Sequence, residues 1–159
     1  MAGRFRNKYE AMKMAKPIWA CLKCGWFTQE GKTRVCPECS GGRNISISTC
    51  EHFDSQGEYY RYKQLELMQR GKIISKLERQ VPYHFHAFNK LNDKPVKIFT
   101  YYPDFRYLDK DGNVVIEDYK PGLKPKKGDP NARRALDGVF MLKQRAMKLV
   151  YNIDVKLSH

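Results

Sequence analysis

The sequence predicts an α/β domain with a mixed β-sheet, preceded by a smaller accessory module. With 159 residues, the chain can form one compact core and a small appended unit, but not two full-sized domains. From Phe53 onward, helical and strand-like patterns alternate, an order that is typical of α/β folds. The segment before Phe53 differs, because it carries paired cysteines and many polar residues. We therefore expect one core domain and one accessory module.

The N-terminal part of the chain divides into a basic segment and the cysteine-containing module. Residues 1–16 carry basic side chains without sustained apolar periodicity, so we expect a short basic helix or arm there. Residues 17–48 contain the cysteine pairs and include Ser40-Gly41-Gly42, which is typical of a boundary or tight turn. The predicted organisation is an arm at 1–16, a module at 17–48 and a core domain at 53–159.

Four of the five cysteines form two CxxC pairs, Cys21 with Cys24 and Cys36 with Cys39. Two such pairs can supply four thiolates to a tetrahedral Zn²⁺ ion, and a closed thiolate shell is typical of a structural site. The alternative is reduced thiols or redox pairs, but a thioredoxin-like motif would need a βαβ context around a single CxxC. The segment resembles a zinc ribbon. Cys50 is left over, and we interpret it as a small, half-buried hydrophobic residue.

The core domain is predicted to contain a helix, three strands, a second helix and a last strand. Ser55 and Glu58 have the spacing of a capping box and predict where the first helix begins, and Gly71 predicts where it ends. Asp111-Gly112 is a hairpin signal between two strand patterns. The predicted strands cover 80–88, 98–108, 114–120 and 151–157, the second helix covers 132–150, and 90–97 is predicted to be a polar turn region.

The composition of the chain favours a polyanionic partner. It has 30 Lys and Arg residues against 17 Asp and Glu, a formal charge of +13 and a pI near 9.6. Nucleic acid is therefore the expected partner. No stretch approaches the roughly 18 consecutive apolar residues of a membrane-spanning helix, and the N-terminus lacks the apolar core of a signal peptide. We expect a soluble, cytoplasmic protein with no membrane partner.

Three acidic residues and one lysine are candidates for a catalytic site. Asp118 and Lys120 are two apart on a predicted strand, so they project to the same face, and Asp104 lies on the preceding strand. Acids among apolar strand residues are costly to bury unless they bind a cation, so these residues suit either a metal site or an exposed strand face with a solvated Asp–Lys pair. The position of Glu58 favours the metal site. Helical spacing places Glu58 on the face that should pack on the sheet, although it could instead serve as a capping-box acid.

The order of Glu58, Pro103-Asp104 and Asp118-Tyr119-Lys120 resembles the PD-(D/E)XK nuclease superfamily. The run 53–157 is similar to an uncharacterised phage and prophage nuclease-like domain of that superfamily, related to Holliday-junction resolvases. The stretches FDSQGEYYRYKQL, GKIISKLERQVPY, YYPDFRY and VVIEDYKPG carry the resemblance. The cysteine module lies outside it.

The resemblance implies a restriction-endonuclease-like core, a mixed sheet flanked by helices, that cuts DNA with Mg²⁺ or Mn²⁺. Asp104 and Asp118 would hold the metal, and Glu58 would complete or bridge the site. Lys120 would orient or deprotonate the attacking water, or stabilise the phosphorane. The expected substrate is branched or replicating phage DNA, in the host cytoplasm if a phage encodes the protein, and a homodimer is expected by resemblance. The alternatives are a zinc-ribbon protein that binds nucleic acid without cutting it and, less favoured, an adaptor that binds a protein partner.

The remaining polar residues of the core domain have less specific interpretations. Glu117 should point to the opposite strand face from Asp118, toward solvent or as a supporting acid. His84 and His86 share a strand face and are interpreted as half exposed, because no third metal ligand is near in sequence. The candidate DNA-binding residues are Gln80, Lys124, Lys126, Lys127, Arg133 and Arg134.

Overall fold

The computed structural model describes residues 16–29, 35–40, 50–120 and 138–159. The chain divides into two compact units, residues 1–61 and residues 62–159. The predicted boundary between a module at 17–48 and a domain at 53–159 stays a prediction. No helix in the described ranges has the length and apolar character needed to cross a bilayer.

The first unit contains a small antiparallel sheet. Strand β1 (Ile18–Cys21) lies in the centre, between β2 (Phe27–Thr28) and β3 (Cys50–Phe53), and α2 (Pro37–Ser40) is a single turn. The sequence analysis did not predict β3. In the pairing register Cys50 lies opposite Cys21 and is 5% exposed, so its thiol is more enclosed than the half-buried position that we expected.

Helix α3 (Gln56–Arg70) begins and ends where the sequence predicts. Ser55 Oγ accepts a hydrogen bond from the Glu58 N–H (3.1 Å), and Glu58 Oε2 accepts one from the Asp54 N–H (2.8 Å), as in a capping box. At the other end the Ile73 N–H donates to the Met68 carbonyl (2.9 Å) and the Lys72 N–H to the Gln69 carbonyl (3.0 Å). This is the Schellman arrangement.

In this arrangement a lysine occupies the left-handed position that usually favours glycine. Lys72 has a φ of 59°, which costs a side chain with a Cβ about 1–2 kcal/mol. We expect Lys72→Gly to raise the free energy of unfolding by about 0.5–1 kcal/mol, because relief of this strain exceeds the added entropy of the unfolded chain. Urea denaturation measures the effect. The control is Lys110→Gly, because Lys110 is exposed and is not one of the residues with a positive φ. This variant should have a lower free energy of unfolding than the wild type. If Lys72→Gly also lowers the free energy of unfolding, the strain argument fails.

The second unit contains a mixed four-stranded sheet in the order β4-β7-β8-β9. Strands β4 (Ser75–Arg79), β7 (Phe105–Leu108) and β8 (Val114–Tyr119) are antiparallel, and β9 (Val155–Ser158) lies parallel to β8. The chain is thus of the mixed α/β class that the sequence predicts. The predicted hairpin is the β7–β8 connection, in which Gly112 adopts a φ of 82°.

Two of the predicted strands differ from those in the structure. Strand 98–108 is interrupted at Pro103, which has no N–H to donate, so β6 (Lys94–Tyr101) and β7 belong to different sheets. Strand 80–88 begins later than predicted, at Tyr83 of β5 (Tyr83–Asn89), because Gln80, with a φ of 49°, and Pro82 precede it. Strand β4, which ends at Arg79, was not predicted. The predicted turn at 90–97 is wrong in its second half, because β6 starts at Lys94 and pairs with β5.

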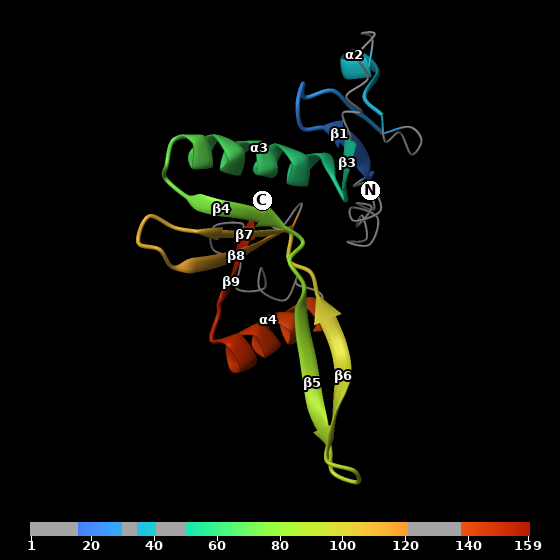
Figure 1. Cartoon of the computed structure of the whole chain (residues 1–159), viewed down its shortest axis with the longest axis vertical. Helices are drawn as coiled ribbons and strands as arrows, with labels where there is room; N and C mark the ends of the chain where they lie inside the picture. Colours follow the sequence, from blue (N-terminus) through green and yellow to red (C-terminus); the bar gives the residue numbers. More distant parts are fainter. Residues whose placement is uncertain (1–15, 30–34, 41–49, 121–137) are drawn as a thin grey trace, which may run out of the picture. The chain divides into compact units, whose positions relative to one another are not determined.

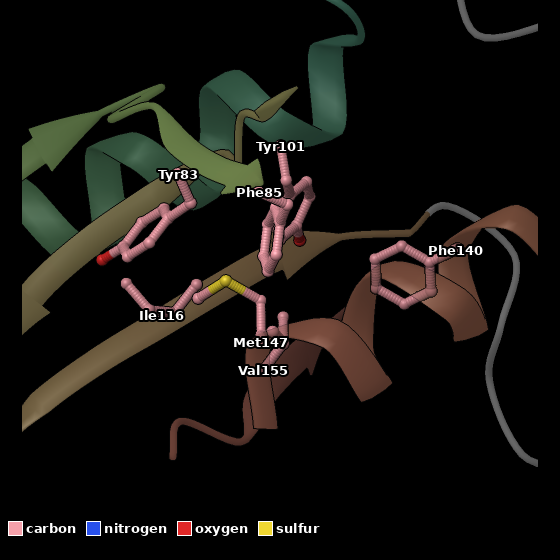
Figure 2. Packing of buried hydrophobic residues seen from close by; sticks show 7 residues of the cluster. All are labelled: Tyr83, Phe85, Tyr101, Ile116, Phe140, Met147 and Val155. Atoms are coloured by element: carbon pink, nitrogen blue, oxygen red, sulfur yellow. The ribbon is translucent and has the colours of Figure 1, made fainter. Parts of the chain in front are cut away.

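Helices cover both faces of the sheet (Figure 1). On the α3 side, Leu65 packs with Phe105 and Tyr107. On the other side lies α4 (Gly138–Tyr151), whose predicted first part, 132–137, is outside the described residues. The core on this side brings α4 together with the sheet and with the base of the β5–β6 hairpin (Figure 2); its buried members are Tyr83, Phe85, Tyr101, Ile116, Phe140, Met147 and Val155.

Candidate functional site

The alternation of β8 decides which acid faces which helix. Ile116 packs in the α4-side core and Val115 in the α3-side core, so Asp118 projects toward α4 and Glu117 toward α3. Asp118 is 3% exposed. Phe105 of β7 pairs with Glu117, which brings Asp104, the residue before β7, opposite Asp118. Asp104 Oδ2 accepts a hydrogen bond from the Tyr119 N–H (2.6 Å).

Asp118 has two side-chain partners. Lys120 forms an ion pair with Oδ1, which agrees with the prediction that the two side chains share a strand face. The Tyr101 hydroxyl donates to Oδ2 (2.6 Å). Burial of the phenol, and then the negative charges of Asp118 and Asp104, raise the pKa of Tyr101. Tyr101 is therefore a permanent hydrogen-bond donor that holds one oxygen of Asp118 in place.

Helix α4 adds an aromatic ring and a second cation to this site. Lys120 Nζ lies 4.6 Å from the ring centroid of Phe140, and Lys143 Nζ lies 5.4 Å from that of Tyr101. Both distances are in the range of cation–π attraction. The sequence analysis missed Tyr101, although its place in Tyr101-Tyr102-Pro103-Asp104, close to the candidate acid, is a signal that could have pointed to it.

Glu117 is not a solvent-facing acid, so that part of the prediction is wrong. Its side chain is 0% exposed, because the α3-side core covers this face of β8. Oε2 accepts a hydrogen bond from the Tyr107 hydroxyl (2.8 Å) and lies 3.5 Å from Lys156 Nζ. The charge is thus satisfied within the α3-side face, away from Asp118.

The second unit contributes two carboxylates to the candidate site. In the described part of this unit, no third histidine, cysteine or acidic ligand joins Asp104 and Asp118 closely enough to form a three-ligand cluster. Glu58 belongs to the first unit, where it is 2% exposed and caps α3. The structure thus shows Glu58 in a capping role, and its role as a metal ligand stays a prediction.

The predicted DNA-binding residues are only partly described. Gln80 is exposed, and its N–H donates to the Asp104 carbonyl (3.2 Å), so its backbone braces the start of β7. The other candidates, Lys124, Lys126, Lys127, Arg133 and Arg134, lie outside the described residues. His84 and His86 are exposed on one face of β5, with ring centroids 6.4 Å apart.

The four paired cysteines come together in the first unit. The sulfur atoms of Cys21, Cys24, Cys36 and Cys39 all lie within 4.8 Å of one another. The Cys21–Cys39 and Cys24–Cys36 sulfur distances are 3.8 and 3.4 Å, well beyond the roughly 2.05 Å of a disulfide. The five cysteines, all among the described residues, form no disulfide. Such a set of soft sulfur donors fits a Zn²⁺ ion.

Local structure explains how the first cysteine pair reaches this geometry. The Gly25 N–H donates to the Cys21 carbonyl (3.0 Å) and the Cys21 N–H to the Trp26 carbonyl (2.7 Å), which closes a tight turn that carries Cys24. Gly25 adopts a φ of 84°, a conformation available to glycine. Burial raises the pKa of Cys36, so a bound cation would be needed to favour its thiolate.

Residues 41–157 match the family described as "Protein of unknown function (DUF1064)". The chain belongs to the DUF1064 family. No curated protein and no solved structure matches this DUF1064 protein. The DUF1064 match includes Asp104, Asp118 and Lys120 but begins after Cys39. The four-cysteine cluster is thus an addition to the DUF1064 region.

Proposed function

We propose that this DUF1064 protein is a divalent-metal-dependent DNA endonuclease with a PD-(D/E)XK core and a structural zinc site. The observation that supports the proposal best is the meeting of Asp104, Asp118 and Lys120 at the adjoining ends of two paired strands. Two carboxylates and an ammonium group in this arrangement suit phosphodiester hydrolysis. The branched or replicating DNA expected from the resemblance is the proposed substrate class.

The donor set suits a small, hard cation. Mg²⁺ is commonly held by one or two carboxylates together with waters and substrate phosphates, and Asp104 and Asp118 supply two carboxylates. When bound there, the metal would activate water and offset the charge of the phosphate in the transition state. Carboxylate oxygens accept more than one partner, so the hydrogen bonds from Tyr101 and Tyr119 are compatible with this role.

The protein's own side chains prepare the site for a polyanion. Asp104 and Asp118 alone would repel a phosphate, but Lys120 and Lys143 bring two positive charges to the same region. Lys120 uses one donor on Asp118, and its ammonium has further donors for the phosphate or the attacking water. Tyr101 keeps Asp118 in a single orientation, which limits reorganisation during the reaction.

The second candidate function is a nucleic-acid-binding protein without catalytic activity. The formal charge of +13 favours it, since positive charge suits binding to a phosphate backbone, and the four-cysteine cluster fits the zinc ribbon of such a protein. The two functions differ in their dependence on metal. A binding protein leaves DNA intact in Mg²⁺, whereas the nuclease cuts it.

The deciding experiment is a cleavage assay with labelled linear, flapped and four-way-junction DNA. The zinc-loaded protein is incubated with Mg²⁺, with Mn²⁺ or without added metal, and Lys120→Met is compared with Lys110→Met in the exposed β7–β8 turn. We expect cleavage only with added metal. Loss of the Lys120 ammonium should slow cleavage by about 10²- to 10⁴-fold, whereas Lys110→Met should have little effect. If the folded wild-type protein binds DNA but cuts no substrate in either metal, the second candidate function replaces the first.

A further inference from the structure

The β5–β6 hairpin is firmly attached at one end. Tyr83 and Phe85 of β5 and Tyr101 of β6 are buried in the α4-side core. The Tyr151 ring of α4 lies 5.1 Å from the Tyr83 ring and 5.5 Å from the Phe85 ring, and its hydroxyl donates to the His84 carbonyl (2.8 Å). A two-stranded ribbon is only marginally stable alone, so this anchoring keeps the hairpin ordered.

Beyond the register shift at Phe85/His86, the hairpin exposes large apolar side chains. Phe88 is 73% exposed and Leu91, in the turn, is 95% exposed; Ile98 is 62% and Val96 is 49% exposed. Figure 1 shows this half of the ribbon extending away from the four-stranded sheet and from α4. Grouped exposed apolar side chains on an ordered projection are typical of a binding surface.

The same half of the hairpin is basic. Residues 86–98 contain Lys90, Lys94 and Lys97 and one acidic residue, Asp93, which leaves a formal charge of +2. The pairing register puts Phe88 opposite Pro95 and His86 opposite Lys97. Since alternate residues of a strand share a face, the ring of Phe88 lies on the face that also carries His86 and Lys97. One face of the hairpin thus carries an aromatic ring together with a cationic group.

We propose that this half of the hairpin, residues 86–98, binds unpaired nucleotides of branched DNA. Phe88 stacks on a base, and Lys97, on the same face, contacts a neighbouring phosphate. Interleaved aromatic and basic side chains are how proteins bind single strands without reading their sequence. A paired base already stacks on its neighbours, so an exposed ring gains most from an unpaired one. A second copy of the chain suits the surface less well, since each copy would bring a charge of +2.

The inference rests on the proposed function, because it takes DNA as the substrate and explains a preference for branched forms. Binding can nevertheless be measured without cleavage. The full-length, zinc-loaded protein without added Mg²⁺ or Mn²⁺ is titrated with a duplex that carries a single-stranded flap. The flap contains 2-aminopurine, whose fluorescence is quenched when a ring stacks on it. A fully paired duplex with the same label is the comparison.

We expect wild-type protein to quench the flap label and to leave the duplex label unchanged. Phe88→Ala should abolish the quenching and weaken flap binding by about 5- to 150-fold, whereas Phe88→Trp should retain both. Lys97→Met, on the face of Phe88, should retain quenching but reduce the salt dependence of flap binding by about 0.7 in the logarithmic slope. Leu67→Ala, at an exposed position of α3 outside the hairpin, should change neither the quenching nor the affinity for the flap.

Equal flap binding and quenching by Phe88→Ala and wild-type protein would overturn the inference, even if the enzyme cuts DNA. Light scattering could instead show that the wild-type protein is a dimer and that Phe88→Ala is a monomer. That result would also overturn the inference, because residues 86–98 would then bind a second copy of the chain. Conversely, Phe88-dependent quenching by a protein that cuts no DNA would support the hairpin's role while refuting the proposed nuclease.

Discussion

Removal of metal from the four-cysteine cluster should unfold the small sheet formed by β1, β2 and β3. These strands are four residues long or shorter, too short to supply a large hydrophobic core. Structural Zn²⁺ contributes about 10–16 kcal/mol of apparent free energy in small zinc-binding peptides, more than such a sheet can replace. We therefore expect one Zn²⁺ per chain in the purified protein and loss of ordered structure around the cysteines when a strong chelator removes it.

The chain carries its own reporter for this experiment. Its two tryptophans, Trp19 and Trp26, both pack against the cysteine cluster. Tryptophan fluorescence and near-ultraviolet circular dichroism therefore follow this sheet, and elemental analysis counts the metal. Cys21→Ser should lose the metal and the tryptophan signals. Cys50→Ala is the matched control, since Cys50 is buried next to the cluster but is not one of the four grouped sulfur ligands. Equal metal loss in both variants would contradict the four-ligand assignment.

Asp118→Asn should lower the rate of metal-dependent DNA cleavage by at least about 10³-fold, equivalent to roughly 4 kcal/mol of transition-state stabilisation. The substitution keeps the shape of the side chain, and the remaining oxygen can still accept the Tyr101 hydrogen bond. What it removes is the negative charge that would hold the cation and the Lys120 ammonium. Initial rates in saturating Mg²⁺, with DNA binding measured separately, test this expectation.

The adjacent acid on β8 provides the control for Asp118. Glu117 is equally buried but projects to the α3 side, where Tyr107 and Lys156 engage it. Glu117→Gln should lower thermal stability, because the buried carboxylate loses its charge and with it the ion pair to the half-exposed Lys156, but should leave the rate of the folded protein within a few-fold. If Glu117→Gln slows cleavage as much as Asp118→Asn at equal folded fraction, the assignment of the α4 side as the catalytic side is wrong.

Features that depend on neighbouring residues in the chain could be predicted without the structure. The CxxC spacing indicated the cysteine cluster, because each pair needs only one tight turn. Strand alternation put Asp118 and Lys120 on one face, and the spacing of Ser55 and Glu58 located the start of α3. The strand face and the helix start involve contacts within a few residues, where backbone geometry leaves few alternatives.

Features that depend on which distant segments pair were decided by the tertiary structure. Strand propensity at 98–108 could not reveal that Pro103 directs β6 to β5 and β7 to β8. Only this division brings the Tyr101 hydroxyl to Asp118, and only the packing of α4 adds Phe140 and Lys143. The burial of Glu117 likewise depends on α3 covering the second face of β8. Local propensity favours a conformation for a segment but does not select its partner, which is chosen by burial of apolar surface over the whole unit.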